Sequence, residues 1–359
     1  MDSLVKIFNG KRILVTGDTG FKGSWLSLWL HELGARVVGY ALPPERESDH
    51  FNLIKLNRII KHINGDVRDF NRFKKVCDNF KPEFIFHLAA QALVSISYDE
   101  PKRTFDTNVS GSLNILEIAR LSKYLKVLVY ITSDKCYKNK EVTRGYCESD
   151  ELGGRDPYSA SKAAAEMVFS AYKNSFFGNK NGFGAASTRA GNVIGGGDWS
   201  PNRIVPDCIK ALQDNKPIIL RRPEATRPWQ HVLEPLSGYL TLAANLYEEP
   251  KKYSDSWNFG PGRKDIKTVK DVANKIVRYW GQGEVKVQKP ENIFYESTLL
   301  YLNCNKTLKL LKWHTKWDFE RSIKETVLWY KSVFEGKPAL DVSRQQIKSY
   351  MGIKNDKGR

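Results

Sequence analysis

Cysteine pairs, an apolar leader and a long hydrophobic run are all missing from this 359-residue chain. The five cysteines form no CxxC pair, which argues against a disulfide framework or a zinc site, so we expect no metal. The first residues, MDSLVKIFNGKR, carry charges and lack an apolar core of signal-peptide length. The longest apolar run, FIFHLAAQALV, is about half of a ~20-residue membrane span. We therefore expect a cytoplasmic protein that does not enter the membrane.

Blocks of basic residues are also absent, although Lys and Arg total 57 against 40 Asp and Glu, a net charge of +17. Such a charge attracts anions, nucleic acid among them. The basic residues are scattered and accompany no nucleic-acid motif. This pattern favours a solvated basic surface on a protein that handles small phosphorylated ligands, with no nucleic-acid partner.

What the first half does contain is an alternation of β-branched runs with longer helical patterns, typical of βαβ units. From about residue 191, loops rich in Gly, Pro, Arg and Trp replace this rhythm. The sequence predicts a Rossmann-type doubly wound parallel sheet in residues 1–190, interleaved with a smaller substrate-binding domain in 191–359. The expected strands are 12–16, 36–41, 61–65, 83–89, 126–133 and 184–190, and the long helices are 102–122 and 157–176.

A glycine loop, VTGDTGFKG, joins the first expected strand to its helix. Gly17, Gly20 and Gly23 would let a pyrophosphate approach the backbone, and the helix N-terminus would supply amide donors. The loop therefore predicts a dinucleotide site. Asp18 would put a carboxylate near the diphosphate, so we expect it to point outward or to accept an amide hydrogen bond.

The end of the second strand lacks the acidic residue that usually holds the adenosine ribose of NAD. Ala41 and Leu42 occupy that region and Arg46 follows shortly after, so these residues leave NAD and NADP both open. Asp66, in NGDVRD, is a candidate partner for the adenine amino group. An Asx turn after Gly65 is the alternative.

A Tyr-x-x-x-Lys pair on a helix places a phenol and an ammonium on one face, and the cation lowers the tyrosine pKa toward that of a general base. The spacing occurs four times, at Tyr98–Lys102, Tyr158–Lys162, Tyr247–Lys251 and Tyr350–Lys354. Proline interrupts two of these pairs, and glycine interrupts the last. Only Tyr158–Lys162 begins a good helix, behind Pro157, and it is the predicted catalytic pair.

Several blocks together resemble the extended short-chain dehydrogenase/reductases that act on nucleotide sugars, and among these the CDP-glucose 4,6-dehydratases. The blocks are TGxxGFxG (16–23), HLAAQALV (87–94), TSDKCY (132–137), GGRDPYSASKAAAE (153–166), RAGNVIGGGDW (189–199) and RPWQHVLEPLSGYL (227–240). The resemblance covers residues 16 to about 240 and is looser over the last hundred. It implies NAD as cofactor, a nucleotide-sugar substrate (CDP-glucose), a homodimer formed through 102–122 and 157–176, and a role in deoxysugar synthesis for lipopolysaccharide O-antigen.

The resemblance also implies a reaction: oxidation of the sugar at C4, elimination of water across C5 and C6, and return of the hydride to C6. Tyr158 would take the C4 hydroxyl proton, Lys162 would lower its pKa, and Ser133 would hydrogen-bond the C4 oxygen. Asp134 would protonate the departing C6 hydroxyl. Lys135 would either remove the C5 proton or stabilise the enolate electrostatically.

Further residues receive binding roles by the same resemblance. Those expected to contact the cofactor are Gly17, Thr19, Gly20, Phe21, Lys22, Gly23, Asp66, Val67, Leu88, Ala89, Ala90, Gln91, Asn108, Thr132, Tyr158 and Lys162. Those expected to contact the substrate are Gln91, Ser133, Arg189, Asn192, Arg203 and Arg227. His231 is expected to be structural.

The sequence departs from the family pattern at three positions: Asp18, Ser95 and Asn303. The last two bear on which sugar or nucleotide is accepted. A dehydratase or 4-epimerase for another nucleotide hexose therefore stays open, as does a non-catalytic NAD-binding sensor. An epimerase needs no acid–base pair for elimination, so TSDK argues against it, and the retained Tyr158–Lys162 pair argues against a sensor.

Overall fold

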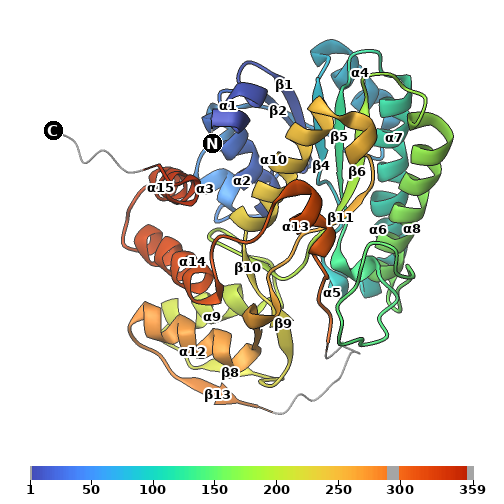
Figure 1. Cartoon of the computed structure of the whole chain (residues 1–359). Helices are drawn as coiled ribbons and strands as arrows, with labels where there is room; N and C mark the ends of the chain where they lie inside the picture. Colours follow the sequence, from blue (N-terminus) through green and yellow to red (C-terminus); the bar gives the residue numbers. More distant parts are fainter. Residues whose placement is uncertain (1, 289–298, 354–359) are drawn as a thin grey trace.

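A seven-stranded parallel sheet forms the centre of the computed structural model, which describes residues 2–288 and 299–353 (Figure 1). The strands follow the order β11-β6-β5-β4-β1-β2-β3, and each neighbouring pair is parallel. They are β1 Arg12–Thr16, β2 Arg36–Ala41, β3 Lys61–Asn64, β4 Phe84–His87, β5 Val127–Ile131, β6 Gly184–Arg189 and β11 Ser256–Asn258. This order confirms the expected Rossmann-type doubly wound sheet, whose winding changes direction between β1 and β4.

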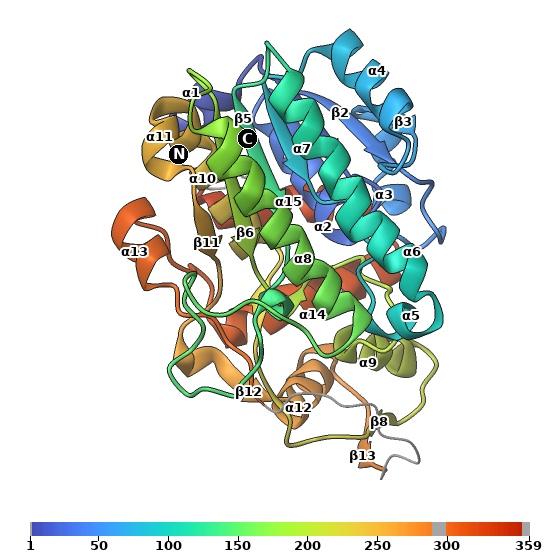
Figure 2. The same cartoon turned by 90° about the vertical axis from the view of Figure 1, so that its right-hand side faces the viewer.

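Alternate side chains of the strands enter two separate hydrophobic cores. On β1, Ile13 and Val15 face a core shared with α2 (Phe21–Glu32) and α10 (Leu233–Glu248). Leu14 faces the other core, shared with α4 (Phe70–Phe80), α7 (Gly111–Leu121) and α8 (Pro157–Tyr172), and Figure 2 shows α7 and α8 side by side there. Both faces of the sheet are therefore covered by helices, as a parallel sheet requires.

The second half of the chain contributes to this sheet and also builds a smaller lobe below it (Figure 1). In the lobe, α12 packs against α9 and α14. Three two-stranded sheets accompany these helices: β7 Val193–Ile194 with β10 Gln230–His231, β9 Thr226–Pro228 with β12 Ile266–Thr268, and β8 Ile218–Leu220 with β13 Val285–Val287. The remaining helices are α1 Asp2–Phe8, α3 His50–Leu53, α5 Val94–Asp99, α6 Pro101–Phe105, α9 Ile204–Gln213, α11 Pro250–Tyr253, α12 Val269–Trp280, α13 Asn305–Leu311, α14 Phe319–Phe334 and α15 Ala339–Met351.

Both long helical segments expected from the sequence are present, and each contains a π-helical turn that the hydrophobic pattern does not predict. The first runs through α6, a π turn at Asp106–Ser110, and α7. The second is α8 followed by a π turn at Lys173–Phe177. A π turn holds one extra residue and is frequent at functional sites.

Residues beyond 190 also complete the main sheet, because β11 pairs with β6 and α10 packs on β5 and β6. The functional division at residue 190 stays a prediction. Over the described ranges 2–288 and 299–353, no helix is both long enough and apolar enough to cross a membrane.

Candidate active site

The glycine loop lies at the carboxyl end of β1, where the winding changes direction. Gly17 has φ +74°, and a Cβ there would lie 2.8 Å from the backbone nitrogen of Ala89. A Cβ at Gly23 would lie 2.0 Å from the Gly17 carbonyl oxygen. Side chains at either position would push this loop away from its neighbours. The loop therefore sits tightly at the N-terminus of α2, whose first amide groups have no partner within the helix and favour an anion.

Asp18 lies inside the fold, so the expected outward orientation is wrong. Its carboxylate is fully buried, and Oδ2 accepts a hydrogen bond from His62 Nδ1 on β3 at 2.7 Å. The absence of a side chain at Gly39 makes room, since a Cβ there would lie 1.9 Å from the same oxygen. Burial raises the pKa of Asp18, and the bond from His62 opposes that rise. The prediction failed because a polar partner from a distant strand was not visible in the local sequence.

The end of β2, which lacks an acidic residue, is joined to the glycine loop by a hydrogen bond. Thr19 donates its hydroxyl to the carbonyl oxygen of Leu42 at 2.9 Å, which ties the glycine loop to the chain after β2. Arg46 pairs with Glu45 and Asp49, at 3.5 and 3.7 Å. The guanidinium nearest this position therefore already has two carboxylate partners.

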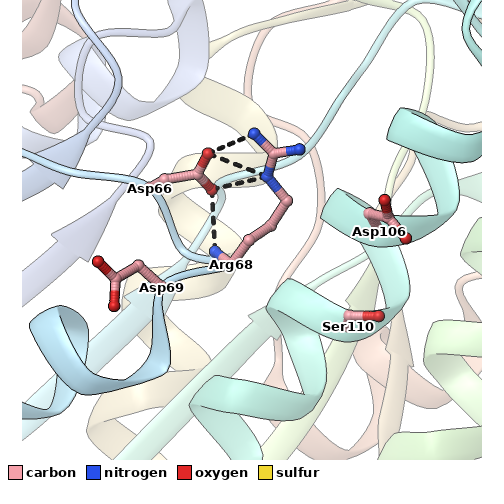
Figure 3. Close-up of a pocket in the computed structure, with 5 residues that line it drawn as sticks. All are labelled: Asp66, Arg68, Asp69, Asp106 and Ser110. Carbon is pink, nitrogen blue, oxygen red and sulfur yellow. Dashed lines mark hydrogen bonds and ion pairs between the residues drawn. The ribbon is translucent and has the colours of Figure 1, made fainter.

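A cavity of about 430 Å³ lies beside the carboxyl end of β3 and is lined by Asp66, Arg68, Asp69, Asp106 and Ser110 (Figure 3). The Asp66 carboxylate accepts the backbone amide of Arg68 at 2.9 Å, which is the Asx turn considered as the alternative. It also accepts the Arg68 guanidinium at 2.6 and 2.9 Å. The carboxylate is only partly exposed, so both the turn and a contact into the cavity are compatible with its position.

Across this cavity, the residues after β4 are held by Asn108 in the first π turn. Asn108 is buried; its Oδ1 accepts the Gln91 amide at 2.8 Å, and its Nδ2 donates to the Gln91 carbonyl at 3.0 Å and to Ser161 Oγ at 2.9 Å. The Gln91 side chain bonds to Leu93 in its own loop and to Thr104 on α6. Asn108 thus joins the HLAAQ loop to α8, as a supporting residue should. Leu88, Ala89 and Ala90 are partly exposed in that loop, and Val67 is buried against Gly111.

Tyr158 and Lys162 stand one turn apart at the start of α8, which begins at Pro157 and is capped by Asp156. The other tyrosine–lysine spacings are broken as predicted: α5 ends before α6 between Tyr98 and Lys102, and α10 ends before α11 between Tyr247 and Lys251. In the last, α15 ends at Met351, and Lys354 lies outside the described residues.

The pKa values around Tyr158 differ from the simple sequence picture. Burial raises the pKa of Tyr158 to about 12, while a hydrogen bond with Ser133 and the nearby Arg203 partly offset this rise. Burial and the nearby Lys22 lower the pKa of Lys162 to about 7, and burial and Arg203 lower the pKa of Lys22 to about 8. Three cationic side chains therefore converge on one desolvated region, which an anionic ligand would stabilise.

The acid–base segment follows β5 directly and forms a 3₁₀ turn at Asp134–Cys136. Ser133 donates its hydroxyl to Asp134 Oδ1 at 3.0 Å and accepts the Lys135 amide at 3.2 Å. Asp134 is buried, and Asn192 Nδ2 lies 3.4 Å from its Oδ2. Lys135 is partly exposed. Ser133 and Asp134 are thus brought together with Tyr158, and Asn192 joins them from the loop after β6.

The three arginines expected to bind substrate have different surroundings. Arg189 is only 3% exposed and is held by Glu166 and Tyr137, so its guanidinium is already engaged within the protein, and its contact with the substrate stays a prediction. Arg203 is partly exposed and pairs with Asp198 at 2.8 Å. Arg227 on β9 donates to the Thr226 carbonyl at 2.7 Å and is partly exposed.

His231 is fully buried and packs its ring against Trp25 and Trp317, as a structural residue would. Burial lowers the pKa of His231 to about 3, so it stays neutral.

Glu166 is the residue that the sequence reasoning missed. It lies on α8 one turn beyond Lys162, is 1% exposed, and bonds Thr132, Ser187 and Arg189. The four-residue spacing of Tyr158, Lys162 and Glu166 would have placed it on the catalytic face of the helix.

Comparison with known proteins gives a consistent family. Residues 14–326 match the family model described as GDP-mannose 4,6 dehydratase. The chain is 46% identical over 348 residues to CDP-glucose 4,6-dehydratase of Salmonella typhimurium, covering 96% of this chain and 97% of that protein.

Two solved structures share the fold. A Bacillus anthracis dTDP-glucose 4,6-dehydratase in complex with NAD has a TM-score of 0.75 at 23% identity, covering 92% of this chain and 100% of that one. A Thermus thermophilus UDP-glucose 4-epimerase in complex with NAD has a TM-score of 0.74 at 26% identity, covering 91% and 99%. Dehydratases and epimerases thus share this fold, so the fold alone does not distinguish them. The family match over residues 14–326 and the 46% identity to a dehydratase over 96% of the chain do. The chain belongs to the GDP-mannose 4,6-dehydratase family of extended short-chain dehydrogenase/reductases.

Proposed function

We propose that the protein is an NAD-dependent CDP-glucose 4,6-dehydratase, which converts CDP-D-glucose to CDP-4-keto-6-deoxy-D-glucose. The observation that carries this proposal is the buried turn at Ser133 and Asp134, in which Ser133 is hydrogen-bonded to Tyr158 at the N-terminus of α8. An epimerase requires the tyrosine but has no use for an acid beside it. The 46% identical Salmonella enzyme of that name supports the choice of nucleotide and sugar.

The residues present fit a dinucleotide. Gly17 and Gly23 leave no room for side chains at the N-terminus of α2, and Lys22 and Lys162 have lowered pKa values that an anionic neighbour would raise. Asp66 faces the cavity in which an adenine amino group would be bound. Because Arg46 is already paired with two carboxylates, it favours NAD over a 2′-phosphorylated cofactor. Bound NAD would accept the hydride from sugar C4 and return it to C6.

In the oxidation step, Tyr158 removes the proton of the C4 hydroxyl and Ser133 hydrogen-bonds the same oxygen. A phenol with a pKa of about 12 is a weak base at neutral pH, so the phenolate depends on the Ser133 hydrogen bond and on the positive charge of Arg203. Lys162, one turn along α8, would add its charge and would hold the ribose of bound NAD.

In the elimination step, Asp134 donates a proton to the departing C6 hydroxyl. The carboxyl group is buried and is held by the Ser133 hydroxyl at 3.0 Å, so its orientation toward a substrate is fixed. Lys135 either accepts the C5 proton or stabilises the enolate by its charge. Arg203, Arg227 and Asn192 would contact the nucleotide diphosphate and sugar, which assigns substrate binding to residues 191–359.

The experiment is to incubate the protein with NAD and CDP-glucose deuterated at C4. Deuterium at C6 of a 4-keto product supports the whole cycle, whereas a C4-epimerised sugar with an intact C6 hydroxyl contradicts it. Lys135→Ala should abolish 4-keto-6-deoxy product while reduced cofactor still forms. Unchanged turnover would remove Lys135 from the mechanism.

We propose further that two copies pair through the outer faces of α6, α7 and α8, which Figure 2 shows facing the viewer. Exposed apolar side chains gather along these helices and the π turn after α8: Phe105, Leu113, Leu121, Met167 and Phe176. Such a surface marks an interaction site. We propose that this homodimer is cytoplasmic and that it serves deoxysugar synthesis for O-antigen.

A further inference from the structure

The acid–base segment is anchored at both ends to one buried ion pair. At its start, Thr132 donates its hydroxyl to Glu166 Oε1 at 2.5 Å. At its end, the Tyr137 hydroxyl accepts a hydrogen bond from Arg189 Nη1 at 2.7 Å. Arg189 Nη2 in turn donates to Glu166 Oε2 at 2.8 Å. Ser133, Asp134 and Lys135 lie between these two anchors.

Other bonds hold the ion pair itself in place. Ser187 on β6 donates to Glu166 at 2.8 Å, and the Glu148 carbonyl accepts Arg189 at 3.1 Å. Burial disfavours the charge of Glu166, but Arg189 and the hydroxyl donors outweigh burial and hold its pKa below the usual range. Glu166 therefore stays ionised at neutral pH, and both of its oxygens are engaged.

The same carboxylate stands on the helix that carries the redox pair. Tyr158, Lys162 and Glu166 are four residues apart and share one face of α8. The helix thus sets the position of Tyr158 directly and that of the Ser133–Lys135 turn through Glu166. A single rigid element fixes the oxidation residues relative to the elimination residues.

We propose that Glu166 is a positioning residue that, with Arg189, holds the Ser133–Asp134–Lys135 turn in register with Tyr158 and Lys162. This inference rests on the proposed dehydratase function and deepens it. Losing the anchors should slow elimination more than oxidation. Oxidation keeps Tyr158 and Lys162, which α8 fixes, and is disturbed only through Ser133, whereas Asp134 and Lys135 both lose their supports. Misplacement of about 1 Å is enough to cost a catalytic step up to ~100-fold.

The first variants leave Glu166 unchanged, because Glu166→Gln leaves Arg189 buried without a charge partner and strongly destabilises the fold. Thr132→Val removes one anchor and keeps the shape, Thr132→Ser keeps the hydroxyl, and Tyr137→Phe removes the other anchor. Thr326→Val, which removes a similarly buried hydroxyl in α14, is the matched control.

Single-turnover measurements then separate reduced-cofactor formation from 4-keto-6-deoxy product formation. Thr132→Val and Tyr137→Phe should slow the second step about tenfold or more and slow the first step clearly less, so reduced cofactor accumulates. Thr132→Ser should restore product formation, and Thr326→Val should leave both steps as in the wild type. Equal loss of both steps in Thr132→Val, or no difference between the Val and Ser variants, would overturn the proposal.

Hydrogen exchange gives a readout that does not need the reaction. Amides of residues 132–137 should exchange faster in Thr132→Val than in Thr132→Ser, and unchanged exchange would overturn the anchoring. If the wild type forms no 4-keto product from CDP-glucose, the proposed function fails, and the exchange result still decides the anchoring separately.

Discussion

Gly191→Ala tests the position of Asp134 by adding a single methyl group. A Cβ at Gly191 would lie 2.0 Å from Asp134 Oδ2, 2.2 Å from its Cγ and 2.4 Å from its Oδ1. Rotating the carboxylate about its own axis cannot relieve a clash with all three atoms. Gly191 is not among the glycines with positive φ, so alanine adds no backbone strain there.

The magnitude follows from this geometry. Real Cβ contacts below 3.0 Å essentially do not occur, so the Asp134 carboxylate must move by about 1 Å. That shift disturbs its bond from Ser133 and its contact with Asn192. A displacement of this size costs about 10²-fold in rate, or about 2.7 kcal/mol of activation free energy. The loss should fall mainly on the elimination, since the three atoms nearest to the added methyl all belong to Asp134.

The assay compares steady-state turnover of CDP-glucose with single-turnover formation of reduced cofactor. Gly191→Ala should lower turnover about 100-fold and leave reduced-cofactor formation within a few-fold of wild type. Gly262→Ala is the control, because its Cβ would meet no atom within 4 Å and its φ is not left-handed. Turnover of Gly191→Ala within about threefold of wild type would refute the placement of Asp134 in the reaction.

Three further perturbations test the rest of the site. Gly17→Ala should destabilise the protein by about 1–3 kcal/mol and weaken NAD binding. The control is Gly10→Ala, which has the same left-handed φ but whose Cβ meets nothing within 4 Å, and it should leave NAD binding intact. Thermal unfolding measures the stability and NAD titration measures the binding. The lowered pKa of Lys162, about 7, means that the unfolded chain binds more protons from about pH 7 to 10, so the cofactor-free protein gains stability as pH rises through that window. Lys162→Met should weaken this gain, and the same pH slope in unfolding experiments on both proteins would contradict it. Met167→Glu should convert the proposed dimer to monomers in analytical ultracentrifugation, while the control Leu310→Glu, which changes another exposed apolar side chain, should not. A dimeric Met167→Glu variant would place the interface elsewhere.

The sheet could be predicted because its signals are local. Buried parallel strands are continuous apolar runs, and the limits of β1 and β2 match the expected ranges residue for residue. β11 was not predicted because three residues, SWN, carry no periodicity. The choice of Tyr158–Lys162 among four spacings also rested on local signals. Pro101 and Pro250 each start a new short helix between the tyrosine and the lysine, and Gly352 ends α15.

Contacts between distant segments were harder to predict. Asp18 turns inward because His62 arrives from β3, and the Arg189 guanidinium is paired because Glu166 arrives from α8. The members of each pair are far apart in the sequence. A charged residue in a motif of the family is therefore taken for a ligand contact as long as its partner within the protein is unknown. The prediction of a lowered Tyr158 pKa failed for a related reason. The nearby lysine was visible in the sequence, but the burial that raises the pKa was not.

The π turn at Asp106–Ser110 has a consequence for engineering this fold. It adds one residue to an otherwise continuous helix, so α6 and α7 differ in rotational phase, and Asn108 reaches Gln91 and Ser161 from within it. Deleting a single residue there would restore regular α-helical bonding and could raise the melting temperature. It would also rotate Asn108 off its partners and release the loop after β4. Selection for thermal stability would therefore favour a regular helix at this turn, whereas selection for activity would favour keeping the extra residue.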